Sequence, residues 1–294
     1  MKKKILITGA SGFIGKNLTL DLLNKKFTIY AVLTNKKQNK EFSSRLKKKY
    51  KNFKPIFIDN ISQIEKKISK INASIIINLA SRYLRNHNFT KMIDLINSNI
   101  LFSTSILEAF QKKKLKKFIN LSSVMMHKNS EEYLPLNLYA ATKKSFQDIL
   151  KYYENTYKSV KFYNLFLHDI YGENDQRDKI IHTIIKSHKK NKKVNINSKK
   201  LTLNLLNVED VNQAINLIIN KKIKSGDYII KSNKFTNMVD LINKINLKIK
   251  KQIKLRVLGK KIEKEIKKKI KLLPYWKQKF IIEKDLIKYL DENN

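Results

Sequence analysis

Glycine is scarce in this 294-residue chain, and its placement restricts the fold more than any other feature. Of six glycines, Gly9, Gly12 and Gly15 fall within seven consecutive positions, between an apolar run at residues 4–7 and an amphipathic stretch at 13–23. Gly9 permits a tight turn, Gly12 lets a pyrophosphate approach the backbone, and Gly15 lets a helix pack closely on a strand. N–H groups at the start of that helix attract phosphate. We therefore expect a dinucleotide-binding turn formed by Gly9, Ser11, Gly12, Phe13, Ile14 and Gly15.

Short apolar runs alternate with amphipathic stretches through the first half of the chain. This alternation predicts an α/β fold whose parallel sheet is covered by helices on both faces. The expected strands are residues 4–7, 27–33, 54–58, 73–79, 117–121 and 160–167, and the expected helices are 13–23, 92–110 and 139–157. We predict a Rossmann-type doubly wound parallel sheet over residues 1–168, rejoined by about 201–222. A smaller C-terminal substrate-binding domain is expected to comprise residues 169–200 and 223–294.

The formal charge of +39 is extreme, but its chemistry argues against nucleic acid as the partner. Only five of the 63 basic side chains are arginines, whereas surfaces that read bases or clamp phosphates depend on arginine. Lysine, asparagine and isoleucine are enriched together along the chain, which is typical of an AT-rich coding sequence. Most lysines are therefore expected to form a solvated surface. A positive field would also attract a phosphate-bearing substrate.

Cysteine is absent, which removes disulfides, thiolate metal sites and cysteine nucleophiles. The five histidines include no i, i+4 pair, so no zinc helix and no metal are expected. No apolar run approaches the roughly 20 residues that cross a bilayer, and the apolar run near the N-terminus is too short for a signal peptide. We expect a cytoplasmic protein that uses neither a metal nor a membrane.

The end of the second expected strand bears on the choice between NAD and NADP. NAD enzymes usually place a carboxylate there, which holds the ribose 2′-hydroxyl. This chain has Thr34, Asn35 and Lys36 followed by Lys37, and two cations without a carboxylate suit a 2′-phosphate. NADP is therefore favoured, although the general lysine excess also explains these residues and NAD stays open. Asp59, just after the third strand, is expected on the adenine side of the cofactor.

A tyrosine and a lysine are placed for proton transfer. Tyr139 and Lys143 are spaced i, i+4 at the start of an expected helix, so phenol and ammonium share one face. Tyrosine has a pKa of about 10, and we expect the Lys143 ammonium to lower the pKa of Tyr139 by favouring the phenolate. Ser122 and Ser123 end the preceding strand, at the carboxyl edge where α/β sheets bind ligands. A hydroxyl there can stabilise an oxygen that changes charge during hydride transfer.

Together, these residues resemble the extended short-chain dehydrogenase/reductases, in the group of nucleotide-sugar epimerases and dehydratases. The resemblance runs from end to end and includes Thr8 to Gly15, Asp59, Asn78-Leu79-Ala80, Asn99, Ser122-Ser123, Tyr139 with Lys143, Tyr171-Gly172, Val208-Glu209-Asp210 and residues 273–277. It implies that Tyr139 is the catalytic acid/base and that Lys143 also holds the nicotinamide ribose. Ser123, with Ser122 beside it, would be the catalytic serine.

The same resemblance extends both binding sites. Beyond the glycine turn, cofactor contacts are expected from Thr34, Asn35, Lys36, Asp59, Asn60, Leu79, Ala80, Ser81, Asn99, Tyr139 and Lys143. The substrate, a sugar attached to a nucleotide, is expected to contact Ser81, Ser123, Tyr139, Asn174, Arg177 and Lys179. Arg177 suits a diphosphate because its planar fork binds bidentately. A surface ion pair with Asp175 or Asp178 is equally compatible with the sequence.

Three reactions compete within the family that the chain resembles. A 4,6-dehydratase has an Asp-Glu pair directly after the catalytic hydroxyl, and this chain has Val124-Met125 there, so dehydration is rejected. A 4-epimerase usually has Val-Tyr-Gly next, from which Met126-His127-Lys128 departs. Residues 169–179 resemble the branch of CDP-abequose and CDP-paratose synthases, which reduce a 4-keto sugar for surface polysaccharide. We favour an oxidoreductase that reduces such a ketone with NADPH, with an NAD-dependent 4-epimerase as the alternative.

A different class of function stays open at this point. Some members of this fold family bind RNA or sense cofactors without turnover, which the charge of +39 fits. An RNA-binding face should combine clustered arginines with aromatic side chains, and residues 47–50 with Phe53 approach that pattern only weakly. The intact Ser–Tyr–Lys set favours an enzyme. Relatives often pair through helices equivalent to 92–110 and 139–157, so a homodimer is also expected.

Overall fold

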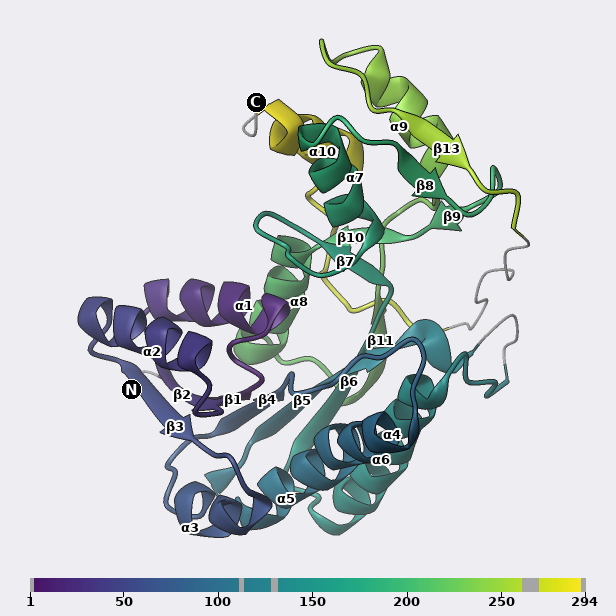
Figure 1. The fold of residues 1–294 in the computed structure, drawn as a ribbon. Coiled ribbons are helices and arrows are strands. Elements are labelled where there is room, and N and C mark those ends of the chain that lie inside the picture. The colour runs from purple at the N-terminus through teal and green to yellow at the C-terminus, as the bar shows by residue number, and fades with distance from the viewer. Residues whose placement is uncertain (1–2, 111–113, 128–131, 261–269, 292–294) are drawn as a thin grey trace.

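A seven-stranded parallel sheet forms the centre of the computed structural model, which describes residues 3–110, 114–127, 132–260 and 270–291 (Figure 1). From one edge to the other the strands are β3 (Phe53–Phe57), β2 (Thr28–Leu33), β1 (Lys4–Thr8), β4 (Ile75–Asn78), β5 (Lys117–Ser123), β6 (Lys161–Leu167) and β11 (Gly226–Ile230). Every neighbouring pair is parallel. The strand order reverses between β1 and β4, which is where such sheets bind ligands. The predicted Rossmann-type α/β fold is confirmed.

Helices cover both faces of this sheet (Figure 1). One face carries α1 (Phe13–Asn24), α2 (Lys37–Lys49) and α8 (Val208–Asn220). The other carries α3 (Ile64–Ile68), α4 (Phe89–Ile96), the π-helical segment η2 (Asn97–Leu101), α5 (Phe102–Ala109) and α6 (Leu138–Thr156). The single helix expected at 92–110 is thus three segments, because a π-helical turn interrupts it.

The strands are buried from both sides, which explains why they are continuous apolar runs in the sequence. Alternate side chains point to opposite faces. On the α6 face, Leu6, Ile76 and Phe118 belong to one buried cluster. On the α8 face, residues such as Ile7 and Ile119 belong to another. Both layers hold the sheet rigid beneath its carboxyl edge.

A smaller layer of elements lies above the carboxyl edge of the sheet (Figure 1). It comprises β7 (Asp169–Tyr171), α7 (Ile180–Lys189), β8 (Val194–Ile196), β9 (Thr202–Leu203), β10 (Leu205–Asn207), β12 (Thr236–Asn237), α9 (Met238–Asn246), β13 (Leu255–Val257) and α10 (Ile282–Asp291). The strands form three two-stranded sheets, β7 with β10, β8 with β13 and β9 with β12. A third apolar cluster, which includes Ile184, Ile242 and Leu286, fills the space between the helices.

One part of the expected domain boundaries differs from the structure. Residues 226–230, expected in the smaller domain with the rest of 223–294, form β11 and pair with β6 along their whole length. The sequence does not predict a strand here, because the segment has only three apolar residues and Asp227 precedes them. Residues 202–207 form β9 and β10 outside the main sheet, whereas α8 packs beside α1 on it. The division into two domains otherwise stays a prediction.

Candidate active site

The glycine turn packs three chain segments so closely that side chains are excluded from it. Gly9 has a φ of +65°, and a Cβ there would lie 2.7 Å from the Ala80 nitrogen at the end of β4. A Cβ on Gly15 would lie 2.1 Å from the Gly9 carbonyl oxygen. The Gly12 N–H donates to that same oxygen at 3.0 Å. The backbone of β1, α1 and β4 therefore meets here as the sequence predicts.

The start of α1 offers its N–H groups to a ligand. Gly12 is the N-cap residue, and no side chain caps the helix. The Thr8 hydroxyl fixes the neighbouring strand end, because it accepts hydrogen bonds from the N–H groups of Leu79 and Ala80 at 3.2 and 3.1 Å. Uncapped N–H groups beside a turn that lacks a side chain at Gly12 fit the pyrophosphate of a dinucleotide.

The ends of β2 and β3 form the second part of the expected cofactor site. The backbone N–H of Asn35 donates to Asp59 at 2.7 Å, and its side-chain amide donates to the same carboxylate. The backbone hydrogen bond lowers the pKa of Asp59 below its usual range. Thr34 accepts a hydrogen bond from Asn39 at 2.8 Å. Lys36 is the exposed N-cap residue of α2, which no side chain caps. Asn60 instead accepts from the Ser62 N–H and begins the short helix η1 (Ile61–Gln63).

Tyr139 lies at the carboxyl edge of the sheet, in the first turn of α6. The helix begins where Asn137 accepts a hydrogen bond from the Ala140 N–H at 3.0 Å. Ser81, in the loop after β4, and Ser123, at the end of β5, lie close enough to the phenol to act on its pKa. The structure thus brings together three residues that the sequence assigned to one site.

The phenol is more firmly protonated than the sequence predicts. Burial raises the pKa of Tyr139 to about 12, and hydrogen bonds with Ser81 and Ser123 oppose this only in part. The expectation that Lys143 lowers this pKa is therefore wrong for the protein without ligands. The i, i+4 spacing shows only that the two groups share a helix face, whereas the desolvation that decides the pKa comes from the surrounding fold.

Lys143 is a buried cation at the same face of α6. Its side chain is buried, and burial lowers its pKa to about 8. Within the described residues, its ammonium forms no hydrogen bond or ion pair. A buried ammonium is costly unless it is hydrogen-bonded, so this position suits ligand hydroxyls such as those of a ribose.

The π-helical segment η2 carries Asn99, whose side chain connects two parts of the site. Asn99 accepts hydrogen bonds from the Ser81 hydroxyl at 3.2 Å and the Arg82 N–H at 2.7 Å. It donates to the Arg82 carbonyl at 3.1 Å and to the Thr142 hydroxyl at 2.9 Å. The local change in helix geometry points Asn99 between the loop after β4 and α6. It thereby holds Ser81 and the residue before Lys143 in fixed positions.

The two serines at the end of β5 have different surroundings. The Ser123 hydroxyl accepts a hydrogen bond from the Met125 N–H at 3.2 Å and begins the short helix η4 (Val124–Met126). The Ser122 hydroxyl is buried without a hydrogen-bond partner among the described residues. Val124 packs with Met126 in an apolar cluster, and Val124 and Met125 stand at the two positions where a dehydratase has carboxylates. Lys128, part of the departure from the epimerase pattern, lies outside the described residues.

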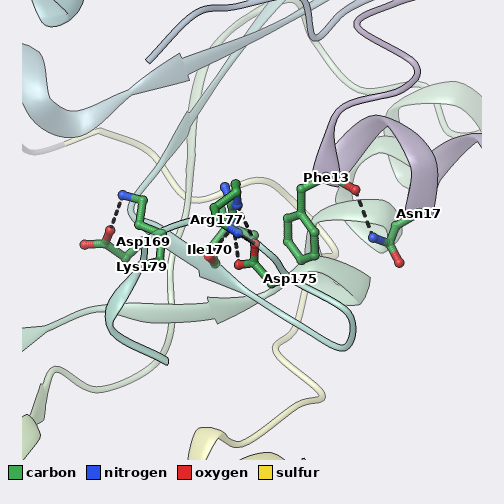
Figure 2. Close-up of polar contacts among 7 residues, drawn as sticks. All are labelled: Phe13, Asn17, Asp169, Ile170, Asp175, Arg177 and Lys179. Atoms are coloured by element: carbon green, nitrogen blue, oxygen red, sulfur yellow. Dashed lines mark hydrogen bonds and ion pairs between the residues drawn. The ribbon is translucent and has the colours of Figure 1, made fainter. Parts of the chain in front are cut away.

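Arg177 lies against the glycine turn (Figure 2). Asp175 accepts two hydrogen bonds from its guanidinium at 2.7 and 2.8 Å, and the Ile170 carbonyl accepts a third at 2.7 Å. The guanidinium carbon lies 4.2 Å from the centre of the Phe13 ring. The ion pair with Asp175 is thus present, whereas the binding of a diphosphate by Arg177 stays a prediction.

Lys179 and a tyrosine that the sequence did not single out complete this side of the site. Lys179 donates to Asp169 at 2.9 Å, and its ammonium lies 4.8 Å from the centre of the Tyr83 ring. The Tyr83 ring in turn meets the Tyr139 ring edge to face, with 5.0 Å between centroids. The signal available in the sequence was one aromatic residue between two arginines in the loop after β4. Asn174 is exposed, with a φ of 59°, and its amide donates to Glu173.

The described residues define no metal site and no membrane-spanning helix. Nowhere among them do three or more His, Asp or Glu side chains come together in a way that could hold a metal ion. No helix within the described ranges has the length and apolarity needed to cross a bilayer.

Comparison with known proteins assigns the chain to a class. Residues 5–230 match the NAD dependent epimerase/dehydratase family, and the chain belongs to that family. It is 29% identical to CDP-abequose synthase of Salmonella muenchen over 235 residues, which cover 78% of this chain and 74% of that protein. It is 28% identical to CDP-abequose synthase of Yersinia pseudotuberculosis over 226 residues, 76% of this chain and 75% of that protein.

Solved structures share the fold at lower sequence identity. A UDP-glucuronic acid 4-epimerase from Bacillus cereus, solved with NAD and a fluorinated UDP-glucuronic acid, superposes with a TM-score of 0.81 and 21% identity. The match covers 99% of this chain and 98% of that one. A UDP-glucose 4-epimerase from Thermotoga maritima gives a TM-score of 0.79 at 19% identity and covers 98% and 97% of the two chains.

Proposed function

We propose that this protein is an NADP-dependent reductase of a 4-keto sugar attached to a nucleotide. The observation that carries the proposal is that Tyr139, on which Ser123 acts, shares a face of α6 with the buried Lys143. Arg177 connects this group to the glycine turn, because its charge acts on Tyr139 and its guanidinium lies on the Phe13 ring. Membership of the NAD dependent epimerase/dehydratase family supports a dinucleotide at that turn. The similarity to two CDP-abequose synthases supports a nucleotide-linked sugar as substrate.

The site residues divide the chemistry among them. A nicotinamide held by the glycine turn and Lys143 would supply the hydride that reduces the carbonyl carbon, and the carbonyl oxygen would gain the electron pair. Ser123 donates a hydrogen bond to that oxygen, which stabilises the charge that develops on it. Tyr139 transfers its phenolic proton to the oxygen, which completes the hydroxyl group. Lys143 holds the ribose hydroxyls and stabilises the phenolate that the proton transfer leaves.

The ligand-free protein holds Tyr139 in the form that a reductase needs. A reductase needs a proton donor, and burial keeps the pKa of the phenol well above neutral pH. The departure of Met126 and His127 from the epimerase pattern also supports reduction. Val124 and Met125 stand where a dehydratase has Asp and Glu, which disfavours dehydration.

Cations surround the positions where the two ligands would carry phosphate. Arg177 and Lys179 reach the site from the segment after β7, and the charge of Arg177 acts on Tyr139. They suit the diphosphate of a nucleotide sugar. Lys36, Lys37 and the uncapped start of α2 suit the 2′-phosphate of NADP. Asp59 accepts a hydrogen bond from the Asn35 N–H, so a carboxylate also lies near these lysines. Competition between NADP and NAD is therefore the direct test of this preference.

NADPH oxidation across a panel of nucleotide-linked 4-keto sugars tests the proposal. We expect turnover with a CDP-linked ketone, loss of at least about 10²-fold in Tyr139→Phe, and no change in Tyr152→Phe, which alters an exposed tyrosine of the same helix. Interconversion of 4-hydroxy epimers without net cofactor use would select the 4-epimerase instead. Tight RNA binding at physiological salt without turnover of any sugar nucleotide would overturn the enzyme assignment.

A further inference from the structure

A row of polar side chains crosses five neighbouring strands just beneath the active site. Strand register places Thr8, Asn78, Asn120, Asn164 and Asp227 at one level of β1, β4, β5, β6 and β11. The first four are buried, with at most 8% of their surface exposed, and Asp227 is exposed at the sheet edge. The row two residues earlier is apolar and consists of Leu6, Ile76, Phe118 and Phe162.

Each side chain in the row hydrogen-bonds the next. The Thr8 hydroxyl donates to Asn78 Oδ1 at 2.8 Å, and the Asn78 amide donates to Asn120 Oδ1 at 3.2 Å. The Asn120 amide donates to Asn164 Oδ1 at 2.9 Å, and the Asn164 amide donates to Asp227 Oδ1 at 2.9 Å. Every donor therefore points from the glycine turn towards β11.

The carboxylate at the end of the row fixes this direction. An asparagine amide can turn over and exchange its donor and acceptor, whereas an ionised carboxylate only accepts. Asn164 must therefore present its NH₂ group to Asp227 and its oxygen to Asn120. The same requirement passes to Asn120 and then to Asn78. Without Asp227, the direction of the row would rest on Thr8, whose hydroxyl already accepts the N–H groups of Leu79 and Ala80.

The direction of the hydrogen bonds affects Thr8, at the end of the row next to the glycine turn. Because Thr8 donates its only hydroxyl proton to Asn78, its lone pairs remain free to accept the N–H groups of Leu79 and Ala80. These N–H groups belong to the strand end against which Gly9 packs. A reversed row would direct an amide donor at Thr8 and weaken that attachment.

Asp227 also holds the helix that bears the proton-transfer pair. Its second oxygen, Oδ2, accepts a hydrogen bond from the Gln147 amide at 2.8 Å. Gln147 is buried on α6, one turn after Lys143. One carboxylate thus ends the row from the glycine turn and anchors α6.

We propose that Asp227 is a positioning residue of the active site, whose carboxylate sets the direction of a buried hydrogen-bonded row that orders the cofactor turn and at the same time anchors α6. The proposal rests on the proposed function in so far as the glycine turn binds the cofactor. Its effect on the turn itself is measurable without any ligand.

The experiment compares three single variants by amide hydrogen exchange of the ligand-free protein and by NADPH and NADH affinity. Asp227→Leu removes the acceptor, and we expect faster exchange at Leu79 and Ala80 and about tenfold weaker cofactor binding. Asp227→Asn keeps an acceptor oxygen for Asn164, while the Gln147 amide can turn over to meet its NH₂ group, so we expect changes below about twofold. Asp148→Leu is the matched control, since Asp148 is an exposed acid next to Gln147 whose carboxylate pairs with Lys144.

Two further variants test whether the row depends on the direction of its hydrogen bonds. Asn164→Asp places two carboxylates side by side and should loosen the turn. Adding Asp227→Asn lets the new amide donate to the carboxylate at 164 and accept from Gln147, so the double variant should regain slow exchange at Leu79 and Ala80. Should Asp227→Leu fail to fold, Asp227→Lys serves in its place, because an exposed edge lysine suits this surface and offers only donors.

Two results would overturn the proposal. One is unchanged exchange at Leu79 and Ala80 in the variant that lacks the acceptor. The other is an Asp227→Asn variant as impaired as Asp227→Leu, which would show that charge rather than hydrogen-bond direction is required. Perturbed exchange together with an absence of any dinucleotide binding would uphold the row and reject the proposed function.

Discussion

Two lysines lie at opposite ends of the parallel strands. Lys143, on α6, lies at the carboxyl ends, and Lys117, the first residue of β5, lies at the amino ends; burial lowers the pKa of both. Lys143, at the carboxyl edge, forms no hydrogen bond or ion pair within the described parts of the chain. Lys117, at the amino end of β5, donates to three backbone carbonyls, those of Ile218, Ile219 and Lys221.

The difference distinguishes a structural cation from one that awaits a ligand. Two of these carbonyls, those of Ile218 and Ile219, are among the groups that α8 leaves without intrahelical partners at its C-terminus, where a positive charge is favoured. Lys3 reinforces this cap with a hydrogen bond of 2.8 Å to the Ile219 carbonyl. Among the described residues no such contact offsets the desolvation cost of Lys143, so the fold keeps a destabilised charge at the place where we propose that a cofactor ribose binds.

Replacement of Lys143 should have the largest effect of all on catalysis. In Lys143→Met we expect the rate of ketone reduction to fall by about 10³-fold, because the phenolate left on Tyr139 and the ribose hydroxyls both lose their cation. Single-turnover kinetics at saturating cofactor would measure this. Activity within tenfold of the original protein would place Lys143 with Lys117 among the structural lysines.

The same variant should gain stability. Since the folded pKa of Lys143 is about 8 instead of the usual 10.5, removal of the charge should raise the free energy of unfolding at pH 7 by up to about 3 kcal/mol. Between pH 8 and 10.5 the folded protein binds fewer protons here than the unfolded chain, so its own stability rises with pH. The advantage of Lys143→Met should therefore shrink across that range. Urea unfolding of the two cofactor-free proteins at several pH values would measure this difference in unfolding free energy. A difference that stays constant between pH 8 and 10.5 would contradict the prediction.

Lys117→Met should show the opposite pattern. Loss of the donor removes the lysine partner of the Ile218 carbonyl near the end of α8, which should cost about 1–3 kcal/mol of unfolding free energy. Ketone reduction should stay within about twofold, because Lys117 lies at the far edge of the sheet from Tyr139. Urea midpoints and kcat of Lys117→Met and Lys143→Met, measured under the same conditions, would show whether Lys117 serves stability and Lys143 serves catalysis. A loss of activity without a loss of stability would contradict it.

Ser122 offers the smallest and most selective test. Its hydroxyl is buried without a partner among the described residues, so Ser122→Ala should change the unfolding free energy of the ligand-free protein by less than about 0.5 kcal/mol. If the hydroxyl serves a ligand, as proposed for this edge, cofactor or substrate affinity should fall by a few-fold. Calorimetric titration of the variant would show it, and a clear loss of stability would mean that the hydroxyl has a structural partner.

The features that the sequence predicts well are those decided over a few residues. Gly9 and Gly15 leave no room for a side chain, so their spacing alone indicates the turn. Tyr139 and Lys143 lie one helical turn apart, so their shared face follows from the sequence. Asp227 and the pKa of Tyr139 depend instead on segments distant in the chain, which pattern reading cannot bring together.

The buried polar row left a signal that is recognisable only with the sheet in view. Asn78, Asn120 and Asn164 each interrupt or end an apolar run at the centre of the fold. A single asparagine in an apolar run does not by itself predict a hydrogen-bonded row, because it is also typical of the end of a strand. Only the register of β4, β5 and β6 shows that the three side chains meet.

The position of β3 and β11 at the two margins of the sheet has a consequence for self-association. An open margin offers unpaired backbone groups to a strand of another molecule. At one margin, β3 contains Pro55, which has no N–H to donate, next to an exposed Lys54. At the other, the Ile229 N–H donates to the Lys271 carbonyl, so an adjoining segment of the same chain already occupies part of β11. Both margins are thus obstructed against fibril growth by strand addition.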